Sequence, residues 1–525
     1  MYVENLEVFY TGVQNRLKVL DKITFSLQKG EILTLLGESG SGKTTCGKAL
    51  LGMLPPSAKI TGGLMRLGNG APVRLNDREV NWHLLRGRQI AMIYQDARLA
   101  LNPVKTVREH FHGTLAYHKL GSKAAIERKS AELLQFLRFD DPARILASYP
   151  FELSGGMCQR VYTALILCLE PEILIADEPT SALDPDGRQE VISLLKQVQQ
   201  SFSLSILLIT HDIGVAAALG GRIIVLENGR IIETGSTNEI LTRPKEPYTR
   251  LLLEARELPV RDAGREKRSG APLLLVENLC KTFKNKGAAY SVLQDVCLEV
   301  YRSESIGLLG ASGCGKSTLA KCITGLERAD RGSIIYHGKD ITHVRGSERK
   351  WVCKHMQMVF QDARASLNPQ RSALQLVQEP LEYLGLGNKR ERIEKARSYL
   401  QQVRLDNDAQ QRRPPQLSTG QCQRIALARA LIVEPDILIC DEAVSALDMV
   451  LQKQILCLLD SLQNALGFAV IMISHDIRII RHYCTLAAVM QNGVITGLIP
   501  TDRLAAYENG DTPSLNAIQQ TEPAY

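Results

Sequence analysis

Short apolar runs alternate with longer amphipathic stretches along this chain. Residues 173–177 and 206–210 are almost wholly apolar, and residues 188–199 between them carry apolar positions at helical spacing. Buried strands of a parallel sheet have this composition, and a helix that crosses over the sheet joins one such strand to the next. The pattern therefore predicts an α/β fold around a mainly parallel sheet.

The whole series of features occurs twice. Ser154 and His211 recur 264 residues later as Ser418 and His475, so the stretch between them is copied without net insertion or deletion. Between the copies, a charged segment lacks apolar periodicity, as a solvated linker does. We predict a first domain at residues 1–253, a linker at 254–272 and a second domain at 273–525.

Two stretches depart from the alternation of strands and helices. Residues 107–139 and 389–404 carry helical patterns without an intervening strand. We therefore expect a helical subdomain inserted in each half of the chain.

Composition excludes several classes of protein. The 525 residues are 45% hydrophobic and 23% charged, so each half can bury its own core. The twelve cysteines lack the paired spacing of a zinc site and are interpreted as reduced thiols. Since the acidic N-terminus is unlike a secretory signal and no apolar run reaches 18 residues, we expect a chain that does not itself cross a membrane. The net charge of +7 comes without a long basic block, which favours a solvated mixed surface over nucleic-acid binding, although the charge alone does not decide between them. We expect no nucleic-acid partner.

A Gly-rich loop follows an apolar run in each half, at residues 37–44 and 310–317. The backbone N–H groups of such a loop approach phosphates, its Lys neutralises phosphate oxygens, and its Thr or Ser hydroxyl ligates Mg²⁺. Two copies between a strand and a helix predict a tandem ATPase. The loop residues assigned to the nucleotide are Gly37, Ser39, Gly40, Gly42, Lys43, Thr44, Thr45, Gly310, Ser312, Gly313, Gly315, Lys316, Ser317 and Thr318.

Each half also carries an Asp and a Glu together at the end of a predicted buried strand. Because side chains alternate along a strand, the two acids point differently and take different roles. We predict that Asp177 and Asp441 hold the Mg²⁺ shell, while Glu178 and Glu442 polarise the attacking water.

In this order, the motifs resemble those of the nucleotide-binding domains of ATP-binding cassette (ABC) transporters, over nearly the whole chain. Leu-Ser-Gly-Gly-Met at 153–157 and Leu-Ser-Thr-Gly-Gln at 417–421 match the signature motif of that family. The resemblance implies two tandem P-loop NTPase domains, with each signature motif reaching the γ-phosphate held by the opposite half. The signature residues assigned to the nucleotide are Ser154, Gly155, Gly156, Ser418 and Gly420.

The resemblance also assigns roles by position. It implies a catalytic set in each half: Glu178, His211 and Gln95 in the first, and Glu442, His475 and Gln361 in the second. It implies Mg²⁺ ligation by Thr44, Gln95, Asp177, Ser317, Gln361 and Asp441. Tyr10 and Phe283 lie where the family stacks an aromatic ring on adenine, although Phe9 beside Tyr10 leaves the choice in the first half open.

Closure of the halves head to tail would form two ATP sites, each from the loop and acids of one half and the signature of the other. The second signature departs from the family at Thr419, where Gly is usual. A Cβ there would crowd the approach of the backbone to phosphate. We therefore expect the site of Lys43, which borrows that signature, to turn over more slowly.

Closer resemblance is to the ATPases of oligopeptide, dipeptide and nickel importers, carried by residues 95–103, 149–157, 243–250 and 361–369. In that family the two ATPases are usually separate subunits, and here they are fused. The resemblance implies an ATP-hydrolysing, energy-coupling subunit of an ABC importer for peptides, nickel or a metal chelate.

The cofactors implied are ATP and Mg²⁺, and the partners are two membrane permeases and, through them, a solute-binding protein. The implied location is peripheral, on the cytoplasmic face of the inner membrane. The alternative is a soluble tandem-cassette ATPase that acts on ribosomes or DNA. Such proteins tend to have a long basic helical linker or zinc-binding insertions, and the segment at 254–272 has neither.

Overall fold

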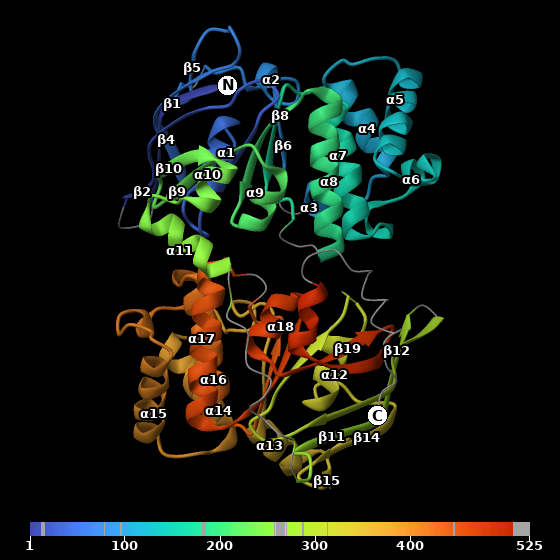
Figure 1. The fold of residues 1–525 in the computed structure, drawn as a ribbon, viewed down its shortest axis with the longest axis vertical. Coiled ribbons are helices and arrows are strands. Elements are labelled where there is room, and N and C mark those ends of the chain that lie inside the picture. Colours follow the sequence, from blue (N-terminus) through green and yellow to red (C-terminus); the bar gives the residue numbers. More distant parts are fainter. Residues whose placement is uncertain are drawn as a thin grey trace. The chain divides into compact units, whose positions relative to one another are not determined.

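The computed structural model describes residues 1–11, 16–77, 79–94, 97–180, 185–256, 258, 268, 270–285, 288–311, 313–444 and 447–507. The chain forms two compact units, one made mainly of residues 1–256 (unit 1) and the other mainly of residues 257–525 (unit 2). Figure 1 colours unit 1 blue to green and unit 2 yellow to red.

A six-stranded sheet forms the centre of each unit. In unit 1 all neighbours are parallel except the edge pair β10 and β9, and the order is β10-β9-β3-β8-β7-β6. Unit 2 repeats this topology. The strands are β3 Ile32–Leu36, β6 Ile90–Ile93, β7 Ile173–Asp177, β8 Ser205–Thr210, β9 Arg222–Glu227, β10 Arg230–Ser236, β13 Ser305–Leu309, β16 Met356–Val359, β17 Ile437–Asp441, β18 Ala469–Ser474, β19 Leu486–Gln491 and β20 Val494–Pro500.

A second, antiparallel sheet lies in each unit, which the apolar pattern did not predict. Its order is β2-β1-β4-β5 in unit 1 and β12-β11-β14-β15 in unit 2. These strands mix buried and exposed positions and contain bulges, which obscures a simple alternation. The strands are β1 Tyr2–Thr11, β2 Arg16–Ser26, β4 Ala58–Arg66, β5 Val73–Arg74, β11 Leu274–Asn285, β12 Ala288–Val300, β14 Arg331–Tyr336 and β15 Lys339–Asp340.

Helices pack around the sheets. In unit 1, one apolar core joins the first helix, α1, to residues of both sheets, so this helix is held between them. The helices of unit 1 outside the helical subdomain are α1 Lys43–Leu50, α2 Trp82–Leu85, α3 Ala97–Ala100, α8 Pro185–Phe202, α9 Ile213–Leu219, α10 Thr237–Thr242 and α11 Pro247–Arg256. Those of unit 2 are α12 Lys316–Ile323, α13 Gly346–His355, α17 Met449–Leu466, α18 Ile477–Tyr483 and η5 Thr501–Tyr507. No helix in the described ranges is long and apolar enough to cross a membrane.

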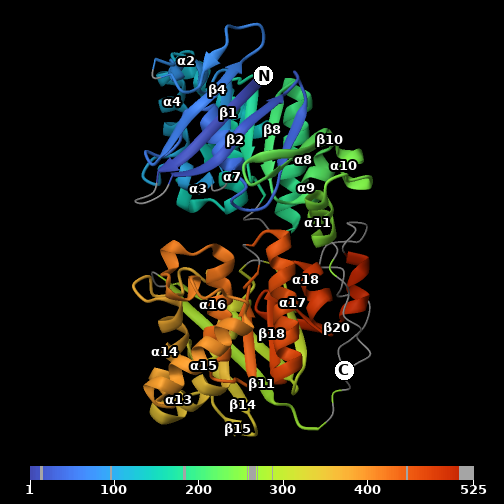
Figure 2. The same ribbon diagram turned by 90° about the vertical axis from the view of Figure 1, so that its left-hand side faces the viewer.

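A helical subdomain is present in each unit, to one side of the antiparallel sheet in Figure 1. Figure 2 shows α14, α15 and α16 of unit 2 packed together. The elements are α4 Val107–Tyr117, α5 Lys123–Phe136, α6 Pro142–Ala147, η1 Pro150–Glu152 and α7 Gly155–Leu167, and in unit 2 α14 Ala373–Leu384, α15 Lys389–Gln402, η3 Ala409–Gln411, η4 Pro414–Gln416 and α16 Thr419–Leu431. The sequence prediction missed α14, which contains Pro380.

Candidate nucleotide sites

The Gly-rich loop of unit 1 lies between β3 and α1 and has the geometry of an anion cradle. Gly42, the N-cap of α1, has φ of +104°, a left-handed conformation that a residue with a Cβ rarely adopts. The loop therefore makes a tight turn into α1. Lys43 is buried and its Nζ donates to the carbonyl oxygens of Gly37 at 2.8 Å and Glu38 at 2.7 Å.

Burial lowers the pKa of the Lys43 ammonium, and the neighbouring carboxylates of Glu178 and Asp177 only partly oppose that effect. An incoming phosphate would supply the negative charge that this desolvated cation lacks. The side chain is thus placed to bind an anion at the N-terminus of α1.

Unit 2 repeats this cradle between β13 and α12. The N-cap Gly315 has φ of +112°, and Lys316 Nζ donates to the carbonyl oxygens of Gly310 and Ala311, both at 2.8 Å. Cys314 replaces the Ser41 of unit 1, with its Sγ 3.8 Å from Lys316 Nζ. The two loops therefore have the same geometry despite this substitution.

A hydroxyl and a carboxylate meet behind each loop. Thr44 Oγ1 donates to Asp177 Oδ1 at 2.9 Å, and Ser317 Oγ donates to Asp441 Oδ1 at 2.9 Å. Burial raises the pKa of both aspartates above the usual range. Hydroxyl and carboxylate oxygens are the hard ligands that Mg²⁺ prefers, so the residues present fit that ion.

The acid at the end of β7 faces a histidine at the end of β8. His211 Nδ1 lies 3.0 Å from Glu178 Oε1, and the Glu178 N–H donates to the Ile209 carbonyl at 2.8 Å. Burial opposes the charge of Glu178, but its contact with His211 and the charges of His211 and Lys43 outweigh burial, so the net effect lowers its pKa. Glu178 is thus held as a carboxylate, the form that accepts a proton.

Unit 2 has the same arrangement, and here the glutamine is among the described residues. His475 Nδ1 lies 3.4 Å from Glu442 Oε1, and Gln361 Nε2 donates to Glu442 Oε2 at 2.8 Å. Glu178 and Glu442 share a positive φ, of 46° and 47°, which is uncommon for a residue with a side chain. The predicted base, histidine and glutamine of unit 2 therefore meet in one place.

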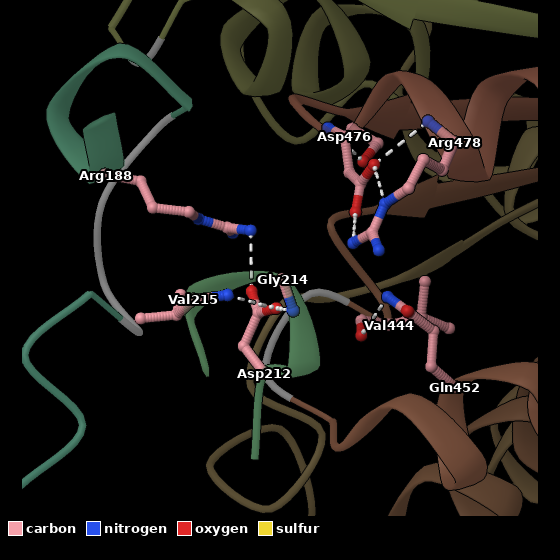
Figure 3. A network of polar contacts seen from close by, with 9 residues as sticks. Arg188, Asp212, Gly214, Val215, Val444, Gln452, Asp476 and Arg478 are labelled. Atoms are coloured by element: carbon pink, nitrogen blue, oxygen red, sulfur yellow. Dashed lines mark hydrogen bonds and ion pairs between the residues drawn. The ribbon is translucent and has the colours of Figure 1, made fainter. Parts of the chain in front are cut away.

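The histidines stand beside aspartates that the sequence analysis did not identify. Asp212 follows His211 and caps α9 by accepting from the N–H groups of Gly214 and Val215, and Arg188 of α8 donates to it at 2.8 Å (Figure 3). The cap fixes the start of α9, which follows the histidine directly. An Asp directly after a histidine and before an apolar helical stretch is the sequence signal that could have revealed it.

In unit 2 the arginine that pairs with the equivalent aspartate lies at a different position. Asp476 caps α18 and accepts from both the backbone and the guanidinium of Arg478, with the closest approach at 2.6 Å (Figure 3). The position equivalent to Arg188 holds Gln452, whose side chain donates instead to the Val444 carbonyl at 3.2 Å. An arginine therefore pairs with this aspartate in both units, but it comes from α8 in unit 1 and from α18 in unit 2.

The predicted signature residues lie at the N-termini of two helices. Ser154 is the N-cap of α7 and Ser418 the N-cap of α16, and each hydroxyl accepts a backbone N–H, from Met157 and Gln421 respectively. Both helices are 13 residues long, so each has a substantial dipole at this end.

Two comparisons with known proteins decide the family. The sequence profile of the ABC transporter family matches residues 20–181 and 293–445. The glutathione import ATP-binding protein GsiA of Escherichia coli K12 is 33% identical over 99% of this chain and 90% of that protein. The protein of the same name in Salmonella typhi is 32% identical over 99% of this chain and 89% of that protein.

The chain belongs to the ABC transporter family. It contains two ABC cassettes and is an ATP-hydrolysing subunit of an ABC importer, as the sequence predicted. The predicted fold class is likewise confirmed. The alternative, a soluble tandem cassette that acts on ribosomes or DNA, is not favoured by these relatives. A dimeric ATP-binding cassette solved with ADP and Pi is 28% identical, covers 43% of this chain and 98% of its own, and superposes with a TM-score of 0.41.

The remaining predicted residues of the two cassettes differ in how the structure places them. Gln95 and Ser312 lie outside the described residues. Ser39, Gly40 and Gly313 are exposed in the loops, and Thr45 and Thr318 are half-buried on α1 and α12. Gly155 and Gly156 are half-buried in the first turn of α7, whereas Gly420 is buried, with Leu451 of α17 against it.

The two predicted adenine-stacking rings lie in equivalent places on the antiparallel sheets. Tyr10 is on β1, opposite Leu17 of β2, and packs against the core of unit 1. Phe283 is on β11, opposite Tyr290 of β12, with ring centroids 6.2 Å apart. Tyr290 is an aromatic neighbour that the sequence analysis did not name. Phe9 lies instead beneath the Arg16 guanidinium, 4.2 Å from it.

Proposed function

We propose that the solute imported with the help of this chain is a small peptide of the glutathione class. The observation that supports the proposal is the full-length match to glutathione import proteins, in which the chain aligns over both cassettes. The sequence left three substrate classes open: peptides, nickel and a metal chelate. The match favours peptides, and nickel or a metal chelate becomes the second choice.

We also propose roles for the site residues. Lys43 and Lys316 would neutralise the phosphates of ATP, and Glu178 and Glu442 would each accept a proton from the attacking water. His211, His475, Gln95 and Gln361 would orient that water and the γ-phosphate. Mg²⁺, held by Thr44, Gln95 and Asp177 or by Ser317, Gln361 and Asp441, would offset phosphate charge when bound.

Each ATP site of the proposed working state combines the two cassettes. The loop and acids of one cassette would face the signature of the other, namely Ser418 and Gly420 for the Lys43 site, and Ser154, Gly155 and Gly156 for the Lys316 site. The support is that each signature lies at a helix N-terminus, a place suited to the γ-phosphate. ATP would then draw the cassettes together.

The proposed partners are two membrane permeases and, through them, a solute-binding protein, and the proposed location is the cytoplasmic face of the membrane. Import ATP-binding subunits generally have permease partners. In unit 1, Leu99 of α3 is 85% exposed and Phe151 of η1 is 72% exposed, next to the segment of Gln95 and the signature. Large exposed apolar side chains of this kind suit contact with a helix of another protein.

Uptake by cells tests the substrate. In cells from which this chain has been deleted, uptake of radiolabelled glutathione is expected to fall to background and to return with the wild-type chain but not with Lys43→Ala. Uptake of labelled nickel serves as the matched control and should be unchanged. Loss of nickel uptake with normal glutathione uptake would contradict the proposed substrate and leave the ATPase assignment intact.

A further inference from the structure

A cavity of about 210 Å³ lies in unit 2 at the C-terminal end of α12. Its wall consists of the turn after α12, the segment between β15 and α13, and the first part of α13 itself, elements that lie together in Figure 1. The phosphate loop is at the other end of α12. Eight residues of helix separate the two, which is about 12 Å.

Four exposed basic residues contribute to this wall. Arg328, Arg345, Arg349 and His343 line it, and among the described residues the three guanidinium groups have no hydrogen-bond or ion-pair partner. The lining carboxylate, Glu327, lies 3.7 Å from the ammonium of Lys281, which also lies 3.8 Å from Asp330. Asp340 lies close enough to His343 to interact with its charge. The three guanidinium groups outnumber these carboxylates once Lys281 is counted, so the cavity keeps an excess of positive charge.

The two threonines that line the cavity already donate hydrogen bonds within the protein. Thr342 donates to Asp340, and Thr324 donates to the carbonyl of Ala320 in its own helix. The remaining wall is apolar, from Ile341, Val352 and their neighbours. A ligand here would meet guanidinium groups on one part of its surface and hydrocarbon on another.

Unit 1 fills the same position with its own side chains. Gly52, which aligns with Gly325, is covered by Trp82: a Cβ on Gly52 would lie 2.3 Å from that ring, whereas a Cβ on Gly325 would meet nothing within 4 Å. Arg86 lies over the Trp82 ring and donates to the carbonyl oxygens of Leu51 and Gly52, at 2.7 and 2.9 Å. The duplication thus provides a closed copy and an open copy of one place in the fold.

We propose that the open copy binds a phosphate monoester of a small organic molecule. Guanidinium groups bind phosphate through paired N–H donors, and a phosphate monoester carries a charge of −1.5 to −2 at neutral pH. Three arginines match that charge, and the apolar wall accommodates a short carbon chain. The ligand would sit at the far end of the helix that carries Lys316, in the second cassette alone.

Calorimetry on the full chain tests this site with glycerol 3-phosphate as the probe. Saturating Mg-ADP occupies the two phosphate loops throughout, so that the probe cannot bind there. One equivalent of glycerol 3-phosphate is expected to bind, and Arg345→Ala and Arg349→Ala are each expected to weaken it by about tenfold, the effect of one charge-assisted hydrogen bond. Arg390→Ala on α15, whose side chain is 89% exposed and pairs with Glu394, is the matched control and should bind as the wild type does.

A second arm distinguishes a soluble ester from a lipid headgroup. Vesicles containing phosphatidic acid present the same monoester, and vesicles of phosphatidylcholine present none. Binding to the phosphatidic acid vesicles alone, lost in Arg345→Ala, would place the phosphate on a lipid and retain the site. The proposal is overturned if neither probe binds, if Arg345→Ala and Arg349→Ala bind like the wild type, or if malonate binds more tightly than glycerol 3-phosphate.

Discussion

At the scale of single residues, one difference between the two cassettes lies in the signature, at Thr419 of unit 2 and Gly155 of unit 1. Thr419 is the first residue of α16 and is exposed, so its side chain causes no crowding inside unit 2. At the equivalent position of unit 1, a Cβ on Gly155 would approach only Arg98, at 3.8 Å. In the proposed working state, any cost of Thr419 would therefore arise against a nucleotide held by the other cassette.

This leads to a prediction for the two proposed bases. Glu178→Gln and Glu442→Gln should each slow ATP turnover by about a hundredfold in their own site while leaving ATP binding intact, because a neutral amide cannot accept the proton. In the proposed working state the signature that contains Thr419 completes the Glu178 site. That site should therefore contribute less, and Glu442→Gln should reduce total hydrolysis more. Steady-state hydrolysis and equilibrium ATP binding of both variants measure this.

Thr419→Gly is the companion variant for that comparison. It should raise hydrolysis, or narrow the gap between the two glutamine variants, by removing the Cβ. Equal rates for the two variants, unaffected by Thr419→Gly, would show that the sites are equivalent.

At the scale of elements, the caps of α9 and α18 show how the duplicated domains keep one function by different routes. Unit 1 has an arginine on α8 and a glycine at position 214, whereas unit 2 has Gln452 on α17 and Arg478 at the position of that glycine. The aspartate keeps an arginine partner in both. The pairing was invisible in the motifs because the two arginines do not occupy equivalent positions.

The exchange predicts a compensating pair of substitutions. Arg188→Gln should destabilise unit 1 by about 1–2 kcal/mol, because the mostly buried carboxylate of Asp212 loses a charged donor. Adding Gly214→Arg should recover most of that loss by copying unit 2. Thermal unfolding of the single and double variants measures the effect, at about 2–4 °C per kcal/mol. If the double variant is less stable than Arg188→Gln, the compensation is refuted.

A second set of contacts joins three elements of unit 2. Asp436, before β17, accepts from Tyr336 of β14 and contacts His355 Nδ1, at the end of α13, at 2.7 Å. Burial acts to raise the pKa of Asp436, but the contacts with Tyr336 and His355 outweigh it and lower the pKa. A carboxyl whose folded pKa is depressed stabilises the fold above its unfolded pKa, and that stabilisation is lost as the pH falls through the folded pKa.

We therefore expect a pH-dependent difference between the wild type and Asp436→Asn. The variant should be less stable at pH 7, and the gap in the unfolding midpoint should narrow as the pH falls below about 4, the ordinary pKa of an aspartate. Unfolding of both proteins between pH 7 and pH 3 measures this. A gap that stays constant over that interval would show that the charge of Asp436 contributes nothing to stability.

At the scale of the whole molecule, the chain carries two complete sets of loop, acid and histidine. Neither Lys43 nor Lys316 is replaced, and each makes the same two carbonyl contacts. We therefore expect that both ATP sites contribute to one closure of the two cassettes on each other.

The prediction at this scale concerns the loop lysines. Lys43→Ala and Lys316→Ala should each reduce ATP hydrolysis by the full chain by about a hundredfold, because each would remove a charge proposed to stabilise the transition state, in a site proposed to close cooperatively with the other. Hydrolysis measured with each single variant and with the double variant checks this. Full activity in either single variant would exclude the two-site closure.

The sequence by itself determined the duplication, the α/β class, the phosphate loops and the pairs of acids. These features depend on residues close together in the chain, whose spacing and backbone requirements are visible without a structure. The subsidiary helices were determined less well, since α14 contains a proline and the antiparallel strands mix buried and exposed positions.

Only the tertiary structure decided what lies across from what. The contact between Glu178 and His211 joins the ends of two neighbouring strands, and the partner of Asp212 comes from a helix 24 residues earlier. The same holds for the space that Trp82 fills in unit 1, whereas the equivalent space in unit 2 is open. Such contacts depend on how side chains distant in sequence pack, and in two copies of one fold different side chains can occupy the same space.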